Sequence, residues 1–144
     1  MNEANGWRDA VRVMRGASLD AATQVPSAKG RATAFEFTGA GGEQTWIGKA
    51  LLKPSGTIVA HHHGRHEVVL FIIKGGLEIR WGERLEFSTE VSPGDFIYFA
   101  PHVPHQERNL SDSANTEFLV VRSDSERIAV PIDAVACTDP EAIS

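Results

Sequence analysis

Four of the six histidines in this 144-residue chain lie close together in the stretch HHHGRHE, which ends at Glu67. Side chains two residues apart in a strand point to the same face, so the rings of His61 and His63 are expected to project together while His62 turns away. Gly64 allows a bend after them, through which Glu67 can return beside the two rings. Neutral imidazole and carboxylate groups are common ligands of divalent transition metals. The stretch therefore predicts half of a metal site.

The missing ligand is expected from a distant segment, GDFIYFAPHVPHQERN at residues 94–109. It reads as a turn, an apolar strand and a histidine bounded by prolines, His105, which could meet the first cluster across a barrel. A set of imidazoles and one carboxylate suits Fe, Mn, Ni, Zn or Cu as divalent ions, and no sulfur ligand narrows the choice. We predict one divalent transition metal per chain, held by His61, His63, Glu67 and His105.

Short strands are the elements that must position these side chains. Turn signals recur along the chain, as in TGAGGE at residues 38–43, and they separate segments of strand length. Residues 46–52 and 77–81 alternate in hydrophobicity, as half-buried strands do. Residues 68–73 and 96–100 are apolar on both faces, which predicts central strands covered by a second sheet. The fold class indicated is all-β, a sandwich or a barrel.

The two ends of the chain are less regular. Apolar residues between positions 7 and 15 recur at helical spacing, which indicates a short helix or, alternatively, a peripheral strand. Residues 127–135 are expected to form an edge strand interrupted by Pro131, because proline has no N–H to donate to a ladder. We therefore divide the chain into an N-terminal arm or short helix (1–30), a β-barrel (31–135) and a C-terminal tail (136–144).

Charge and hydrophobicity restrict the possible partners. The formal charge is −5 at pH 7 and no basic run is present, which disfavours a nucleic-acid surface. The longest apolar run spans residues 68–73, far short of the roughly 20 residues that cross a bilayer, and the first residues lack the pattern of a secretion signal. We expect a soluble, cytoplasmic protein that binds neither nucleic acid nor membrane. Its single cysteine, Cys137, cannot form an intrachain disulfide.

The two histidine segments make the chain resemble a small single-domain cupin. The first motif of that family contains His-x-His followed three or four residues later by Glu, and the second contains Pro-Gly-Asp, an apolar strand, Pro, His and Asn. The residues that match are His61, His63 and Glu67 for the first, and Pro93, Gly94, Asp95, Pro101, Pro104, His105 and Asn109 for the second. The resemblance covers about residues 44–122. It implies an RmlC-like jelly roll, that is, a double-stranded β-helix barrel, usually dimeric, with three histidines and one glutamate holding a divalent metal inside.

One departure from the family pattern concerns Glu67. Seven residues, not six, separate it from Gly75, so Val68 occupies the place of the glutamate in the longer form of the motif. A shift of one residue along a strand reverses the face to which a side chain points, unless a bulge or the preceding loop absorbs it. If Glu67 points away, the metal keeps three histidines and an additional water, or His66 takes the place of the carboxylate.

The leading functional hypothesis is a metal-dependent enzyme that acts on a small organic molecule in an apolar pocket of the barrel. A metal held by histidines with open positions can polarise a carbonyl, lower the pKa of a bound water or, as iron, activate dioxygen. Dioxygenase chemistry is our first expectation within this class. The alternatives are a non-catalytic ligand-binding or sensor cupin and a metal-dependent isomerase or lyase. We also expect a homodimer, in which residues 1–30 of a partner cover an exposed sheet edge.

Overall fold

The computed structural model describes residues 7–8, 10–11, 13, 31–36, 44–123 and 129–144, and of residues 31–36 only the backbone. Within these ranges the chain forms β-strands and no helix, which confirms the predicted all-β class. The strands are β1 (Arg31–Glu36), β2 (Trp46–Leu52), β3 (His61–His62), β4 (Val68–Lys74), β5 (Leu77–Trp81), β6 (Phe87–Val91), β7 (Phe96–Phe99), β8 (His105–Asn109), β9 (Thr116–Arg122), β10 (Val130–Pro131) and β11 (Glu141–Ala142).

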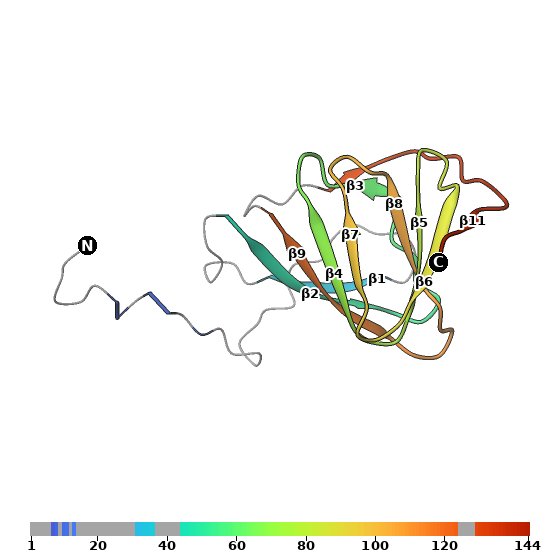
Figure 1. Ribbon diagram of the computed structural model, residues 1–144. Coiled ribbons are helices and arrows are strands. Elements are labelled where there is room, and N and C mark those ends of the chain that lie inside the picture. The colour runs from blue at the N-terminus through green and yellow to red at the C-terminus, as the bar shows by residue number, and fades with distance from the viewer. Residues whose placement is uncertain (1–6, 9, 12, 14–30, 37–43, 124–128) are drawn as a thin grey trace.

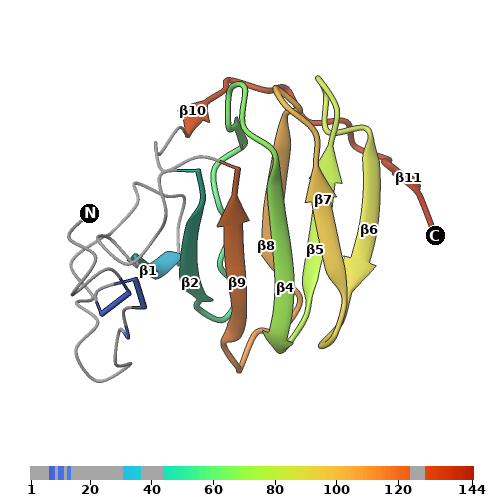
Figure 2. The same ribbon diagram turned by 60° about the vertical axis from the view of Figure 1, so that its left-hand side comes forward.

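The strands form two sheets that face each other, as Figures 1 and 2 show. One sheet has the strand order β1-β2-β9-β4-β7 and the other β10-β3-β8-β5-β6-β11. Neighbouring strands are antiparallel except β11 and β6, which are parallel. Strands far apart in the sequence are neighbours, because the chain crosses repeatedly between the sheets, as it does in a jelly roll. One such pairing, β3 with β8, brings the two histidine segments side by side.

The core lies between the two sheets, and the period of two along each strand selects its residues. In β4, for example, Val68, Leu70 and Ile72 are buried while the residues between them are less buried. Each such aliphatic side chain contributes about 1.5–3 kcal/mol when it is fully removed from water. The buried apolar cluster consists of Ala50, Leu52, Ile58, Val68, Leu70, Ile72, Leu77, Ile79, Val91, Phe99 and Phe118.

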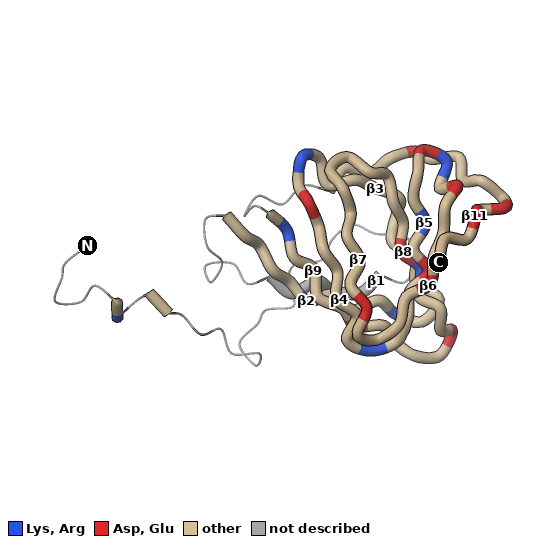
Figure 3. The backbone as a smooth tube through the Cα atoms, viewed as in Figure 1, with Lys and Arg blue, Asp and Glu red and all other residues tan. Residues whose placement is uncertain are grey.

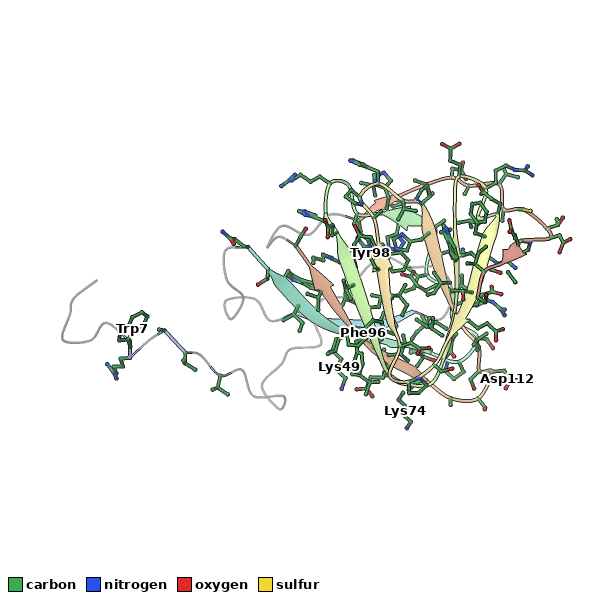
Figure 4. The ribbon with its side chains drawn as sticks, viewed as in Figure 1. Trp7, Lys49, Lys74, Phe96, Tyr98 and Asp112 are labelled. Atoms are coloured by element: carbon green, nitrogen blue, oxygen red, sulfur yellow. The ribbon has the colours of Figure 1, made fainter. Side chains whose placement is uncertain are left out.

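The strand β7 differs from the prediction. Among the described strands it pairs with β4 alone and lies at the edge of its sheet, and Phe96 and Tyr98 are 73% and 58% exposed. Figure 4 shows both side chains on this strand. The prediction that residues 96–100 form a central strand covered on both faces is therefore wrong. An apolar sequence indicates which faces are hydrophobic, but strand order decides whether another layer covers them.

Apolar side chains continue across four strands on the same side of this sheet. The strand register places Ile47, Val121, Val69 and Tyr98 in one row and Leu119, Phe71 and Phe96 in the next. The rings of Phe71 and Phe96 are 4.7 Å apart. We call these seven residues the outer apolar face. Contiguous apolar surface of this kind is characteristic of protein interaction sites.

The C-terminal residues are attached to the second sheet. β10 pairs with β3 at one edge, with Pro131 opposite His61, in agreement with the edge strand predicted for residues 127–135, of which 127 and 128 lie outside the described residues. β11 pairs with β6 at the other edge, so part of the predicted tail (136–144) adds to the barrel.

The predictions for the N-terminus fall mostly outside the described residues. Of the helix or strand expected at residues 7–15, the structure describes five residues, among which the Ala10 N–H donates to the Trp7 carbonyl at 3.2 Å in a turn. The described part of the chain contains no helix with the length and hydrophobicity that crossing a membrane requires. Figure 3 shows acidic and basic positions interspersed along the tube where the residues are described.

Candidate metal centre

Three histidine rings from two distant segments meet between the sheets. His61 lies in β3, His63 follows that strand, and His105 begins β8 directly opposite His61. Ring centroids are 4.7 Å apart for His61 and His63, 4.4 Å for His61 and His105, and 5.0 Å for His63 and His105. One ligand nitrogen from each ring lies within 4.8 Å of the other two. The structure thus brings together three of the four residues predicted from the sequence.

Two of the rings are oriented by backbone carbonyls. The Nδ1 atom of His61 is 2.7 Å from the carbonyl oxygen of Val59, and the Nδ1 atom of His105 is 3.0 Å from that of Val103. A carbonyl can only accept, so Nδ1 carries the proton in both rings, and in the neutral ring Nε2 keeps its lone pair. Ring orientation by such a hydrogen bond is the usual support of a metal-binding histidine.

His105 is the most buried of the three. Its side chain is fully buried, and the ring stacks on Phe99 with a centroid distance of 4.0 Å and an interplanar angle of 20°. His63 is also buried, whereas His61 is partly buried. The side of the site formed by β7 and β8 is therefore closed by an aromatic ring, which excludes water from that side.

A carboxylate that the sequence analysis missed lies beside the triad. Glu107 is two residues after His105, on the same face of β8, and is 3% exposed. Its Oε1 atom is 3.4 Å from Nε2 of His105. Burial alone would raise the pKa of Glu107, but the imidazoles of His105, His61 and His63 lower it to about 2. Burial likewise opposes the charge on His105, yet the neighbouring carboxylate raises the pKa of that ring. The spacing His-x-Glu, which places both side chains on one face if the segment is a strand, could have identified this residue.

The structure does not bring Glu67 to the triad. Its side chain is exposed, between His66 and Val68, which are buried. The Glu67 N–H donates to the Ser123 hydroxyl and its carbonyl accepts from the Ser123 N–H, both at 3.1 Å. One extra residue separates Glu67 from Gly75. Because side chains along a strand point alternately to its two faces, this shift places Val68, and not Glu67, on the inward face. His66, the alternative to Glu67, is buried but is not part of the group of three.

The donor atoms that face one another fit a divalent transition metal. Buried polar atoms in proteins nearly always have a hydrogen-bond partner. Nε2 of His105 and Oε2 of Glu107 are buried and have no hydrogen-bond partner among the residues that the structure describes. Both atoms can donate an electron pair to a cation, and imidazole with carboxylate is a donor set that binds such metals. The absence of sulfur among these groups leaves the choice of metal open, as the sequence does.

Comparison with known proteins identifies the family. The family described as the cupin domain matches residues 48–122, more than half of the chain, and the chain therefore belongs to the cupins. This confirms the resemblance and the jelly-roll fold predicted from the sequence. No curated protein matched the chain.

Solved structures of other cupins share the fold. The polyketide cyclase RemF from Streptomyces resistomycificus is similar over 90% of this chain and 89% of that one, with a TM-score of 0.71 and 21% identity. A sugar phosphate isomerase of the cupin superfamily from Silicibacter pomeroyi has a TM-score of 0.64 and 22% identity over 79% and 76% of the two chains. A deletion mutant of oxalate decarboxylase from Bacillus subtilis has a TM-score of 0.66 and 20% identity over 86% of this chain and 34% of that one.

Proposed function

We propose that the protein is a metal-dependent enzyme that binds one divalent transition metal per chain and acts on a small organic molecule. The observation that supports this most directly is the meeting of His61, His63 and His105, which come from segments about 40 residues apart, inside a cupin barrel. A metal held there by imidazoles would supply a Lewis acid or, if it is iron, a centre for reaction with dioxygen.

The residues of the chain have identifiable parts in this proposal. The carbonyls of Val59 and Val103 fix the tautomer and orientation of two rings, so that their Nε2 atoms converge without reorganisation. Phe99 covers one face of His105 and keeps water from it. These features would hold a metal in a partly buried site, where electrostatic stabilisation of developing charge is strong.

Dioxygenase-type chemistry stays our first expectation for the reaction. The similar structures include a cyclase, an isomerase and a decarboxylase, so the fold itself does not select a reaction. A cupin that binds its ligand without turnover is the alternative. Oxygen uptake with Fe(II) and a panel of catechols, β-diketones and phenolic ketones distinguishes the dioxygenase from the non-catalytic cupin. Tight binding of one compound without turnover of any compound would support the non-catalytic cupin.

Elemental analysis of the purified protein tests the metal site itself. We expect about one equivalent of transition metal per chain in the wild type and in His102→Asn, because His102 is exposed and lies outside the triad. Asparagine is the control substitution because residue 102 has a φ of 61°, which asparagine tolerates. His105→Ala and His61→Gln should lose the metal while keeping the wild-type circular dichroism spectrum. A folded wild-type protein that takes up no metal would refute the proposal.

A further inference from the structure

We infer that Glu107, and not Glu67, supplies the carboxylate ligand of the metal centre, an inference that rests on the metal binding proposed above. It moves the acidic ligand from the segment just before β4 to β8, the strand that carries the third histidine.

The position of Glu107 is unusual for a carboxylate. Its neighbour across the β5–β8 pair is Ile79, which is 1% exposed, and its own side chain is 3% exposed. Burying an ionised carboxylate in such surroundings is costly unless a positive charge compensates it. The ion pair that the structure gives Glu107 is with His105, an imidazole that is charged only when it carries a second proton. A divalent cation between them would supply the compensating charge.

The atoms that face each other are both electron-pair donors. Because Nδ1 of His105 donates to Val103, Nε2 of the neutral ring points its lone pair toward Oε1 of Glu107, 3.4 Å away. That distance is longer than an ordinary N–H···O hydrogen bond, which is about 2.7–3.2 Å. Two ligands that each lie about 2.1 Å from one ion at a tetrahedral angle are about 3.4 Å apart. The observed separation is the one expected for a shared cation.

The arrangement around Glu67 prevents it from taking this part. Both of its backbone polar groups bond to Ser123, which fixes the segment in a register that turns the side chain outward. Turning Glu67 inward requires a slip of one residue, which would expose Val68, now 1% exposed, and also His66, now 2% exposed. Glu107 needs no such change, because it lies on the same buried face of β8 as His105, with its Oε1 atom 3.4 Å from Nε2 of that ring.

Metal affinity measured by chelator competition tests the assignment, with Zn(II) as the probe and Glu67→Gln as the matched control. Glu107→Gln removes the charge at nearly constant volume. We expect it to weaken Zn(II) binding by more than about 100-fold, since even the loss of a group that only supports a ligand costs about 10–100-fold. Glu67→Gln should bind within threefold of the wild type. Glu107→Asp, which keeps the charge, should recover part of the affinity.

Two further measurements separate a ligand from a merely structural residue. The visible spectrum of the Co(II)-loaded protein should change in position and intensity in Glu107→Gln and remain unchanged in Glu67→Gln. The metal-free Glu107→Gln protein should melt at or above the wild-type temperature, because it no longer buries a charge, yet gain less from added Zn(II). Unchanged affinity and spectrum in Glu107→Gln, or their loss in Glu67→Gln, would overturn the assignment. A wild type that binds no Zn(II) or Co(II) would instead show that the proposed metal site itself is wrong.

Discussion

Replacing Asn109 by alanine should destabilise the fold strongly, although this residue touches no metal ligand. Asn109 ends β8, the strand that carries His105 and Glu107, and its side chain is 2% exposed. Its Nδ2 atom lies 3.1, 3.0 and 2.9 Å from the carbonyl oxygens of Leu52, Lys53 and Ala114. The side chain therefore joins β8 to the segment after β2 and to the loop before β9, so we interpret it as structural, as the sequence suggested.

The size of the effect can be worked out from these contacts. Oδ1 of Asn109 also accepts from the Ser111 N–H at 2.9 Å and faces the Thr116 hydroxyl at 2.9 Å. The contacts to Leu52 and Thr116 are buried, whereas Lys53 and Ala114 are exposed enough for water to replace the lost partner. Two lost buried bonds at about 1 kcal/mol each, plus about 1–2 kcal/mol for a carbonyl left unpaired, give a loss of about 3–4 kcal/mol.

Urea unfolding of the metal-free protein measures this difference directly. A loss of about 3 kcal/mol corresponds to a fall in melting temperature of roughly 10 °C for a domain of this size. The control is Asn115→Ala in the neighbouring loop, which is exposed and should change the free energy of unfolding by no more than about 0.5 kcal/mol. If Asn109→Ala costs less than about 1 kcal/mol, the side chain does not hold these segments together and the reasoning fails.

Three further substitutions test other parts of the structure. Gly75→Ala should destabilise by more than about 1 kcal/mol, since Gly75 has a φ of +83° and an added Cβ would lie 2.5 Å from Oγ1 of Thr116; thermal unfolding would show it. Burial raises the pKa of Glu78, but the charges of Arg108 and Arg80 outweigh burial and lower this pKa below its usual value. Folding therefore favours the ionised form of Glu78. Glu78→Gln should therefore lower stability at pH 7, and the difference should disappear as the pH falls below about 4; a pH-independent difference would contradict this. Finally, the outer apolar face should bind a second copy of the chain, so light scattering should report a dimer for the wild type and a monomer for Phe96→Ser; a monomeric wild type would exclude this interface.

Much of the barrel could be predicted from local patterns. The alternation of apolar residues identified the strands around residues 46–52 and 77–81, because in a half-buried strand the period of two is set by the geometry of the backbone. A run that is apolar on both faces identified the strand around residues 68–73. The same geometry placed His61 and His63 on one side. The proline-bounded segment indicated His105 as a partner of the first histidine cluster, and the two motifs together indicated the cupin family.

What local patterns could not decide was which segments become neighbours. Whether β7 lies in the middle or at the edge of its sheet depends on the order of the strands. That order is set by which distant strands pair with one another, and the sequence of β7 alone does not reveal it. The choice between Glu67 and Glu107 depends on the register after the bend at Gly64, where a difference of one residue turns a carboxylate from the barrel to the solvent. The sequence by itself therefore indicated several of the strands, the family and the three histidines. The tertiary structure decided which acidic side chain lies beside them, because the pairing of β8 with both β3 and β5 places Glu107 in the interior next to the His105 ring.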